Sequence, residues 1–439
     1  MTRAARQLAR HLADPRLGWL LFGLGLAVNL ARLGSLLNVP GAPHPAEWGL
    51  HDFRDAIYYP VRAFLDGRDP YDVPTFRAHY PVWQHFPLYA PLTLVLHLPL
   101  GLLPYPWALA LYGALGGAGL LALAALSLRL NGLALRRGPL LALTGALLLS
   151  RPGMMNFLLG QVSLEVVLAT LLAWHWRGRR PWPAALALAF TSIKPTFALP
   201  LAVLLAADGR WRVLLRGGLL AALGNGLPLL WVVHAAGGVG PFLQHAQQNA
   251  AWFAQTISPL AEFARVDLPA LLARLGGRPL PNGAAPLLLV AVLALAAWRY
   301  RRLRESLDEG ERLALVVLAV LLCCYHQAYD LLLLTPAALH LARRALADGA
   351  PPRARLLAAL LALPFANYLA TAVATRPLAP AGPAWLAVTT LNGALLLAAL
   401  ALLATRPATR ERQTQMEEVH PCPPDATPSR PVPPPPPRS

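Results

Sequence analysis

Apolar runs separated by short basic clusters recur along most of the chain. A helix needs about 20 apolar residues to cross a bilayer, and fewer where it is short or broken. On this criterion we expect about twelve membrane-spanning helices. They cover residues 17–37, 106–128, 139–150, 160–176, 182–193, 195–207, 213–235, 285–298, 313–325, 331–347, 356–374 and 385–404. The pattern predicts an all-α integral membrane protein built as a multispan helical bundle.

The arginines follow the same alternation. They cluster in every second loop, for example at residues 129–137, 177–180 and 299–304. Because Lys and Arg concentrate at the cytoplasmic ends of spans, we expect a multi-pass protein of the cell (plasma) membrane with both termini cytoplasmic. This orientation of the spans requires that residues 88–104, interrupted by Pro91 and Pro99, do not cross the membrane. Residues 38–105 are then one long first extracytoplasmic loop with interfacial helices, and 237–283 form a further external loop.

The composition agrees with a membrane location. The 439 residues are 56% hydrophobic and 13% charged, which is too apolar for a soluble globule. A net charge of +17 would suggest nucleic acid in a soluble protein. Here the arginines lie between spans, so we expect membrane lipids and no nucleic acid as partners. Residues 407–439 are Pro-rich and charged, which predicts a disordered cytoplasmic tail after a transmembrane domain of residues 1–406.

Acidic residues gather in the first half of the long external loop. They are Asp52, Asp55, Asp66, Asp69 and Asp72. The default interpretation of any one of them is a helix cap or a solvated surface acid. Asp52 and Asp55 share a face if this segment is helical, and a carboxylate at a membrane surface can act as general base toward a hydroxyl. Asp52 and Asp55 are therefore both candidate site residues, and this pattern alone does not decide which of them would be catalytic.

Lys194 is the one lysine among 38 basic residues, and it lies between two apolar runs in TSIKPTF. An unneeded charge at membrane depth is costly, which argues against a chance survivor. A compact ammonium suits contact with a phosphate. We therefore take Lys194 as a candidate ligand of a phosphate group.

The segment YHQAYD ends one predicted span and begins the next. His326 is a candidate donor to a phosphate or sugar. Tyr329 is equally well explained as an interfacial anchor, and Asp330 as a helix N-cap. Gln161 could bind a polar ligand or a neighbouring span. Asn249 belongs to a polar cluster, QQN, of low specificity.

Several catalytic motifs are absent from the sequence. It contains no glycine-rich phosphate loop with its lysine, no HExxH, no GxSxG and no paired CxxC. Nucleotide-driven and zinc chemistry are therefore disfavoured. We assign no cofactor and no metal ligand, and leave open a divalent metal that assists the reaction.

Five blocks, taken in order, resemble the pattern of glycosyltransferase family 87, whose members are polyprenol-phosphate-mannose-dependent mannosyltransferases and relatives in the GT-C superfamily. The resemblance covers roughly the first 340 residues. The blocks are HDFRDAIYYPVRAFLDGRDPY, FPLYAPLTLVLHLPLGLLP, GQVS, IKPTFALPLAVLL and HQAYDLLLL. It implies a GT-C-like fold and an inverting transfer of a hexose, usually mannose. The implied donor is a polyprenyl-phosphate sugar, and the acceptor is a hydroxyl of a lipid, glycan or protein on the extracytoplasmic face.

The resemblance also implies roles for particular residues. Asp52 falls on the family's acidic position in the first external loop and would be the general base. Lys194 and His326 fall where the family places polar residues that can face the donor phosphate. The last block departs from a familiar variant in which Asp directly follows His, because Gln327 stands there. The role of Asp330, which comes three residues later, is therefore left open.

Two other classes of function compete with a transferase. A multispan lipid-carrier flippase or transporter would share the even number of spans and the charge at membrane depth. Transporters place their polar residues near the midplane, whereas here they gather at one face. A structural or assembly protein would explain the spans but not Asp52 or Lys194.

Overall fold

The computed structural model describes residues 14–36, 50–256, 258–260, 262–281, 283–380 and 382–406. Within these ranges every regular element is a helix, apart from one isolated β-bridge between Arg265 and Gln327. The all-α expectation is therefore confirmed for this part of the chain. The tail predicted at 407–439 lies outside the described residues, as do residues 37–49 of the first external loop and 257, 261 and 282 of the second.

Helices cover the predicted spans, but many are short. Of those described, five are long and apolar enough to cross a membrane. They are α2 (Pro15–Leu36), α8 (Tyr105–Leu130), α14 (Trp211–Ala235), α17 (Ala284–Leu303) and α22 (Pro383–Ala404). The shorter helices are α9 (Arg137–Leu149), α10 (Arg151–Leu159), α11 (Ser163–Trp176), α12 (Pro181–Thr191), α13 (Pro195–Ala207), α18 (Glu309–Cys323), α19 (Thr335–Ala345) and α20 (Pro352–Ala366). Length alone therefore supports five spans, fewer than the twelve expected.

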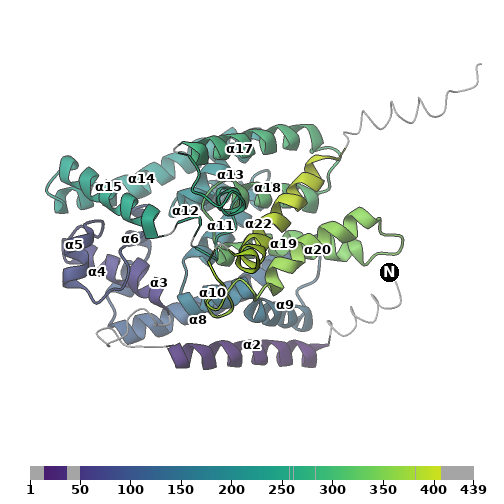
Figure 1. Ribbon diagram of the computed structural model, residues 1–439, viewed down its shortest axis with the longest axis horizontal. Helices are drawn as coiled ribbons and strands as arrows, with labels where there is room; N and C mark the ends of the chain where they lie inside the picture. Colours follow the sequence, from purple (N-terminus) through teal and green to yellow (C-terminus); the bar gives the residue numbers. More distant parts are fainter. Residues whose placement is uncertain are drawn as a thin grey trace, which may run out of the picture.

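The core forms around α18, which lies among the other helices in Figure 1. Its residues from Leu313 to Cys323 are all buried, as expected for a helix that is apolar on every side. A 3₁₀ turn, η3 (Ala328–Leu334), follows and is buried throughout. Residues 331–347, expected to be one span, are therefore the end of this turn and then α19. The apolar run LLLL does not distinguish a 3₁₀ turn from an α-helix.

Helix α2 packs along α9 at close range (Figure 1). A Cβ on Gly145 of α9 would lie 2.4 Å from the backbone of Leu21 in α2. Small residues of this kind allow two membrane helices to approach closely. Asn29 strengthens the contact, because its side-chain amide donates to the carbonyl of Leu148 at 2.8 Å.

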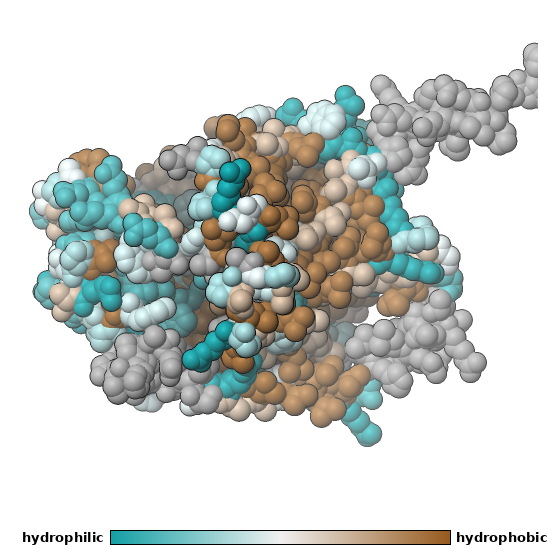
Figure 2. All heavy atoms as spheres, in the orientation of Figure 1, coloured by the Kyte–Doolittle hydropathy of each residue, from teal (hydrophilic) through white to brown (hydrophobic). Residues whose placement is uncertain are grey.

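Short helices of residues 59–96 and α15 form a lobe with its own small hydrophobic cluster at one end of the bundle, whereas residues 50–58 pack into the main core. The segment predicted as the first external loop contains α3 (His51–Phe53), a π-turn η2 (Arg54–Tyr58), α4 (Tyr59–Leu65), α5 (Val73–His79), α6 (Leu92–Leu96) and α7 (Leu98–Gly101). The second contains α15 (Val239–Thr256) and α16 (Leu268–Leu275). Figure 2 shows hydrophilic residues over α4, α5 and α15, and hydrophobic residues over the middle of the molecule. Helices α6 and α7 have 5 and 4 residues, too few to cross a membrane.

The polar candidates and the arginine clusters lie at opposite ends of the same helices. Helix α11 begins at Ser163, beside Gln161, and is followed by Arg177. Helix α12 runs the other way, from Arg180 toward Lys194. Helix α2 begins and α22 ends at the right-hand end of Figure 1, so these two ends of the described chain lie on one side. The fold therefore separates a basic end from the end that carries the lobe.

Candidate functional site

Asp52 lies on α3, in a segment whose backbone is unusual. Leu50, just before it, has φ 56°, a left-handed conformation that is uncommon outside glycine. The Leu50 amide is held by the carbonyl of Leu158 in α10 at 2.7 Å. A π-turn, an insertion frequent at functional sites, follows at Arg54–Tyr58. The local backbone therefore aims Asp52 into the bundle, where it is 8% exposed.

Two side-chain amides hold the Asp52 carboxylate. Gln84 Nε2 donates to Oδ1 at 2.6 Å, and Gln161 Nε2 donates to Oδ2. His51 Nε2 lies 3.5 Å from Oδ1. Neutral amides orient both oxygens without supplying a full positive charge. This arrangement suits a carboxylate that must accept a proton.

Asp55, three residues later, has a different environment. Arg54 pairs with it through Nε–Oδ1 at 2.5 Å and Nη2–Oδ2 at 2.8 Å. The backbone amides of Trp83 and Gln84 also donate to Oδ2. Burial raises the pKa of the Asp55 carboxyl, although Arg54 opposes this shift. Asp55 therefore supports the site indirectly, because it fixes the backbone of Gln84, whose side chain contacts Asp52.

Lys194 is the N-cap residue of α13 and is 6% exposed. Its Nζ donates to Ser163 Oγ at 2.5 Å, and Ser163 Oγ donates to Gln161 Oε1 at 3.4 Å. Gln161 in turn donates to Asp52. A continuous run of hydrogen bonds, which we call the Asp52–Lys194 chain, thus joins the expected base to the expected phosphate ligand.

The YHQAYD segment completes the surroundings of Lys194. Asp330 Oδ1 lies 3.5 Å from Nζ, and Asp330 Oδ2 accepts from the Gln327 amide at 3.0 Å. The ring of Tyr329 faces Nζ at 4.9 Å, a cation–π distance. A second ring, that of Tyr89, lies 5.6 Å from Nζ. The fold thus brings Asp330 and Tyr329 to Lys194.

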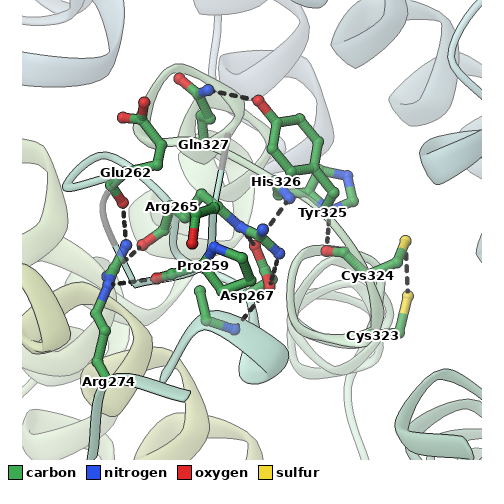
Figure 3. Close-up of polar contacts among 12 residues, drawn as sticks. Pro259, Glu262, Arg265, Asp267, Arg274, Cys323, Cys324, Tyr325, His326 and Gln327 are labelled. Carbon is green, nitrogen blue, oxygen red and sulfur yellow. Dashed lines mark hydrogen bonds and ion pairs between the residues drawn. The ribbon is translucent and has the colours of Figure 1, made fainter. Parts of the chain in front are cut away.

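His326 is fully buried. Its Nδ1 is 3.0 Å from the Cys324 carbonyl oxygen, which can only accept, so Nδ1 carries a hydrogen. Nε2 has no hydrogen-bond partner among the residues that the structure describes. Figure 3 shows the backbone around it: the His326 amide donates to Asp267 Oδ2 at 3.3 Å. A buried ring nitrogen left without a partner is free to bind a ligand group.

Asn249 contacts a different part of the molecule. It lies on α15, and its side-chain amide donates to the Phe86 carbonyl at 2.9 Å. Beside it, His245 pairs with Asp69 at 2.9 Å. These contacts attach α15 to the first external loop. The structure therefore gives Asn249 a docking contact and does not place it in the Asp52–Lys194 chain.

Sequence reasoning missed Gln84 and Ser163. Ser163 belongs to the GQVS block, so its motif could have indicated it. Nothing in the sequence marks Gln84, because its contact with Asp52 depends on the turn that Asp55 stabilises. In the described part of the chain no group of three or more His, Cys, Asp or Glu is placed to hold a metal ion. We therefore assign no residue as a metal ligand.

The fold and the site define a class: a helical membrane protein with a buried carboxylate and a buried ammonium joined at one end of its helices. The family model of glycosyltransferase family 87 matches residues 88–336. The chain therefore belongs to glycosyltransferase family 87, and transfers a sugar from a donor to an acceptor. No curated protein and no solved structure matches it. The match contains Gln161, Lys194 and His326, whereas Asp52 precedes it.

Proposed function

We propose that the protein transfers a hexose, with mannose as the expected sugar, from a polyprenyl-phosphate donor to a hydroxyl on the extracytoplasmic face. The observation that carries this proposal is the Asp52–Lys194 chain, which fixes a base and a phosphate ligand in one buried site. The acceptor hydroxyl belongs to a lipid, a glycan or a protein.

The proposed reaction is one displacement at the anomeric carbon. The acceptor oxygen forms a bond to that carbon, and its proton passes to the Asp52 carboxylate. The bond between the anomeric carbon and the phosphate oxygen breaks, and its electron pair stays on the polyprenyl phosphate. Attack opposite to the leaving group inverts the configuration of the sugar.

Lys194 is suited to the leaving phosphate. Its ammonium is buried, so its attraction for a charge that develops on the phosphate is less screened than in water. Asp330 and Ser163 hold Nζ in position, and Nε2 of His326 can contact the sugar or the phosphate. Asp52 and Lys194 then act on opposite sides of the anomeric carbon.

The helix ends support an extracytoplasmic site in the plasma membrane. The arginine clusters follow α11 and precede α12, at the ends away from Ser163 and Lys194. If the basic end faces the cytoplasm, both chain ends lie there too and the site faces outward. A lipid-linked donor fits this side, because it can reach the site along the bilayer and needs no nucleotide.

A sugar-transfer assay tests the proposal. Purified protein in nanodiscs receives radiolabelled polyprenyl-phosphate mannose, polyprenyl-phosphate glucose or a nucleotide sugar, together with a membrane extract as acceptor source. We expect transfer from a polyprenyl-phosphate sugar and none from the nucleotide sugar. Transfer from the nucleotide sugar alone would refute the lipid-linked donor, and movement of the lipid carrier without transfer would favour a flippase.

A further inference from the structure

A mostly apolar cavity of about 370 Å³ reaches Gln161, the residue that holds Asp52, although Asp52 itself does not line it. Leu50, Gly160 and Gln161 line its end nearest the base, while α8 and α11 form its walls. A second hollow of about 750 Å³ runs along α11 and α12 and shares Glu165, Leu168 and Phe190 with the first. The two hollows therefore adjoin, and we call them together the groove; its lining residues extend from Gln161 to Trp176 and Trp182. A cavity of this size with a few polar groups is typical of a ligand site.

One charged pair interrupts the apolar lining. His97 Nε2 lies 3.2 Å from Glu165 Oε2, and His97 Nδ1 lies 2.8 Å from the Thr93 carbonyl. The ring of Tyr112 in α8 packs edge-on against His97, with the ring centroids 6.2 Å apart. Burial would lower the pKa of His97, but Glu165 raises it more, and the net pKa lies above that of a free imidazole. Charge is costly in such surroundings, so its presence inside a groove indicates a binding role.

The position of the groove relative to the reaction suggests its occupant. Gln161, which holds Asp52, lines the groove, whereas Lys194, Ser163 and Tyr329 are not among its lining residues. In a displacement the base contacts the acceptor, and the phosphate leaves on the opposite side. The groove therefore lies on the acceptor's side of the site. This step rests on the proposed function, which places the donor phosphate at Lys194.

We propose that this groove binds the acceptor, and that the acceptor is an uncharged lipid that carries a hydroxyl. Its chain lies along α8, α11 and α12, and its polar group lies between Gln161 and the His97–Glu165 pair. The Glu165 carboxylate accepts hydrogen bonds from hydroxyl groups, and its pairing with His97 leaves no excess positive charge in the groove to hold a phosphate. The pair thus selects for an uncharged acceptor in this groove and keeps the anionic donor at Lys194.

Photolabelling tests this proposal without requiring turnover. Purified full-length protein in nanodiscs is irradiated with a diacylglycerol that carries a diazirine in its acyl chain, and mass spectrometry identifies the labelled peptides. A phosphatidic acid with the same chains is the charged probe. We expect diacylglycerol to label α8 and α11, and phosphatidic acid to label them about tenfold less, which corresponds to a binding difference of about 1.4 kcal/mol.

Two glycines of α8 offer a matched pair of variants. Gly116 lines the cavity and Gly117 does not, and a Cβ built on either meets no atom within 4 Å. Gly116→Leu fills the cavity and should abolish labelling by diacylglycerol, while Gly117→Leu should leave it unchanged. Glu165→Gln should raise labelling by phosphatidic acid to the level of diacylglycerol. Size-exclusion chromatography checks that each variant is folded.

Three results would overturn the proposal. The first is equal labelling of the wild type by both probes, and the second is diacylglycerol labelling that survives Gly116→Leu. The third is displacement of the diacylglycerol probe by unlabelled polyprenyl phosphate, because the groove would then hold the donor chain. If the proposed function itself is wrong, the result is different. In that case no sugar is transferred in the transfer assay, whatever the labelling shows.

Discussion

Two buried polar networks contact the YHQAYD segment, one through the His326 amide and one through Asp330, and they differ in how completely their charged side chains are paired. In the network around Arg274, shown in Figure 3, Arg274 donates to the carbonyls of Pro259, Glu262, Arg265 and Thr389. Asp267 accepts from Arg265, from the Ala270 amide and from the His326 amide. This network, which we call the Arg274 network, connects α16 to the segment after α18.

The side chains around Lys194, at the end of the Asp52–Lys194 chain, are less fully paired. Asp330 Oδ1 has no hydrogen-bond partner among the described residues, although Lys194 Nζ lies 3.5 Å away. His326 Nε2 also has none. Buried atoms left unpaired cost free energy, and an enzyme retains them when a ligand completes the pairing. We therefore expect the Arg274 network, in which the Arg274 and Asp267 side chains are fully engaged, to stabilise the fold, and we expect the less fully paired side chains around Lys194 to bind substrate.

Asp52→Asn should have the largest effect on activity. Asparagine has nearly the same shape and can still contact Gln84, but it cannot take a proton. Turnover should fall by about 10²–10⁴-fold, the usual contribution of a general base. The rate of sugar transfer and the binding of donor are measured separately, and donor binding should persist.

Asp66→Asn is the matched control, because Asp66 is an exposed acid of the same loop that bonds Tyr80. It should transfer sugar at close to the wild-type rate. Near-normal transfer by Asp52→Asn, or a severe loss in Asp66→Asn, would show that the base lies elsewhere.

Lys194→Met should have the second-largest effect on activity. It removes a charge-assisted contact to the donor phosphate, which is worth about 1.5–3 kcal/mol, so the donor KM should rise about 10- to 100-fold. The amount of folded protein should be similar to the wild type, because the Arg274 network is intact. The KM is measured with a defined polyprenyl-phosphate sugar, and an unchanged KM would remove Lys194 from the donor site.

Arg274→Met should have the opposite effect to Lys194→Met, because it should lower stability and leave the donor KM unchanged. It leaves several buried carbonyls unpaired, at about 1–3 kcal/mol each, and should lower the Tm of the purified protein without changing the donor KM of the folded fraction. Arg278→Met is the control: Arg278 is exposed, and surface substitutions usually change stability by less than about 0.5 kcal/mol. A normal Tm for Arg274→Met, or a raised donor KM, would contradict the division of roles between the two networks.

The sequence pointed to several residues of the candidate site because these residues are chemically unusual where they stand. A lone lysine at membrane depth and an acidic cluster beside the first span both indicated function, and the fold joins Lys194 to Asp52 through Gln161. Gln84 and the His97–Glu165 pair could not be predicted. Their partners are 32 and 68 positions away, and no local pattern specifies such pairings.

The helical class was predictable for the same kind of reason, since apolar runs of this length are rare outside membranes. The number of membrane-spanning helices was not predictable from the sequence. Residues 139–150 and 195–207 are apolar enough to belong to a bundle, but their helices α9 and α13 have 13 residues each. Hydropathy measures how apolar a segment is, whereas packing against neighbouring helices decides where each helix ends.

The anomeric configuration of the product distinguishes a single displacement, with Asp52 as base, from two successive displacements. Purified protein is supplied with a polyprenyl-phosphate sugar of known anomeric configuration, and the new glycosidic bond is examined by NMR. A single displacement in which Asp52 acts only as base requires the opposite configuration in the product. Retention would mean that an enzyme carboxylate attacks the sugar first, and would contradict this account.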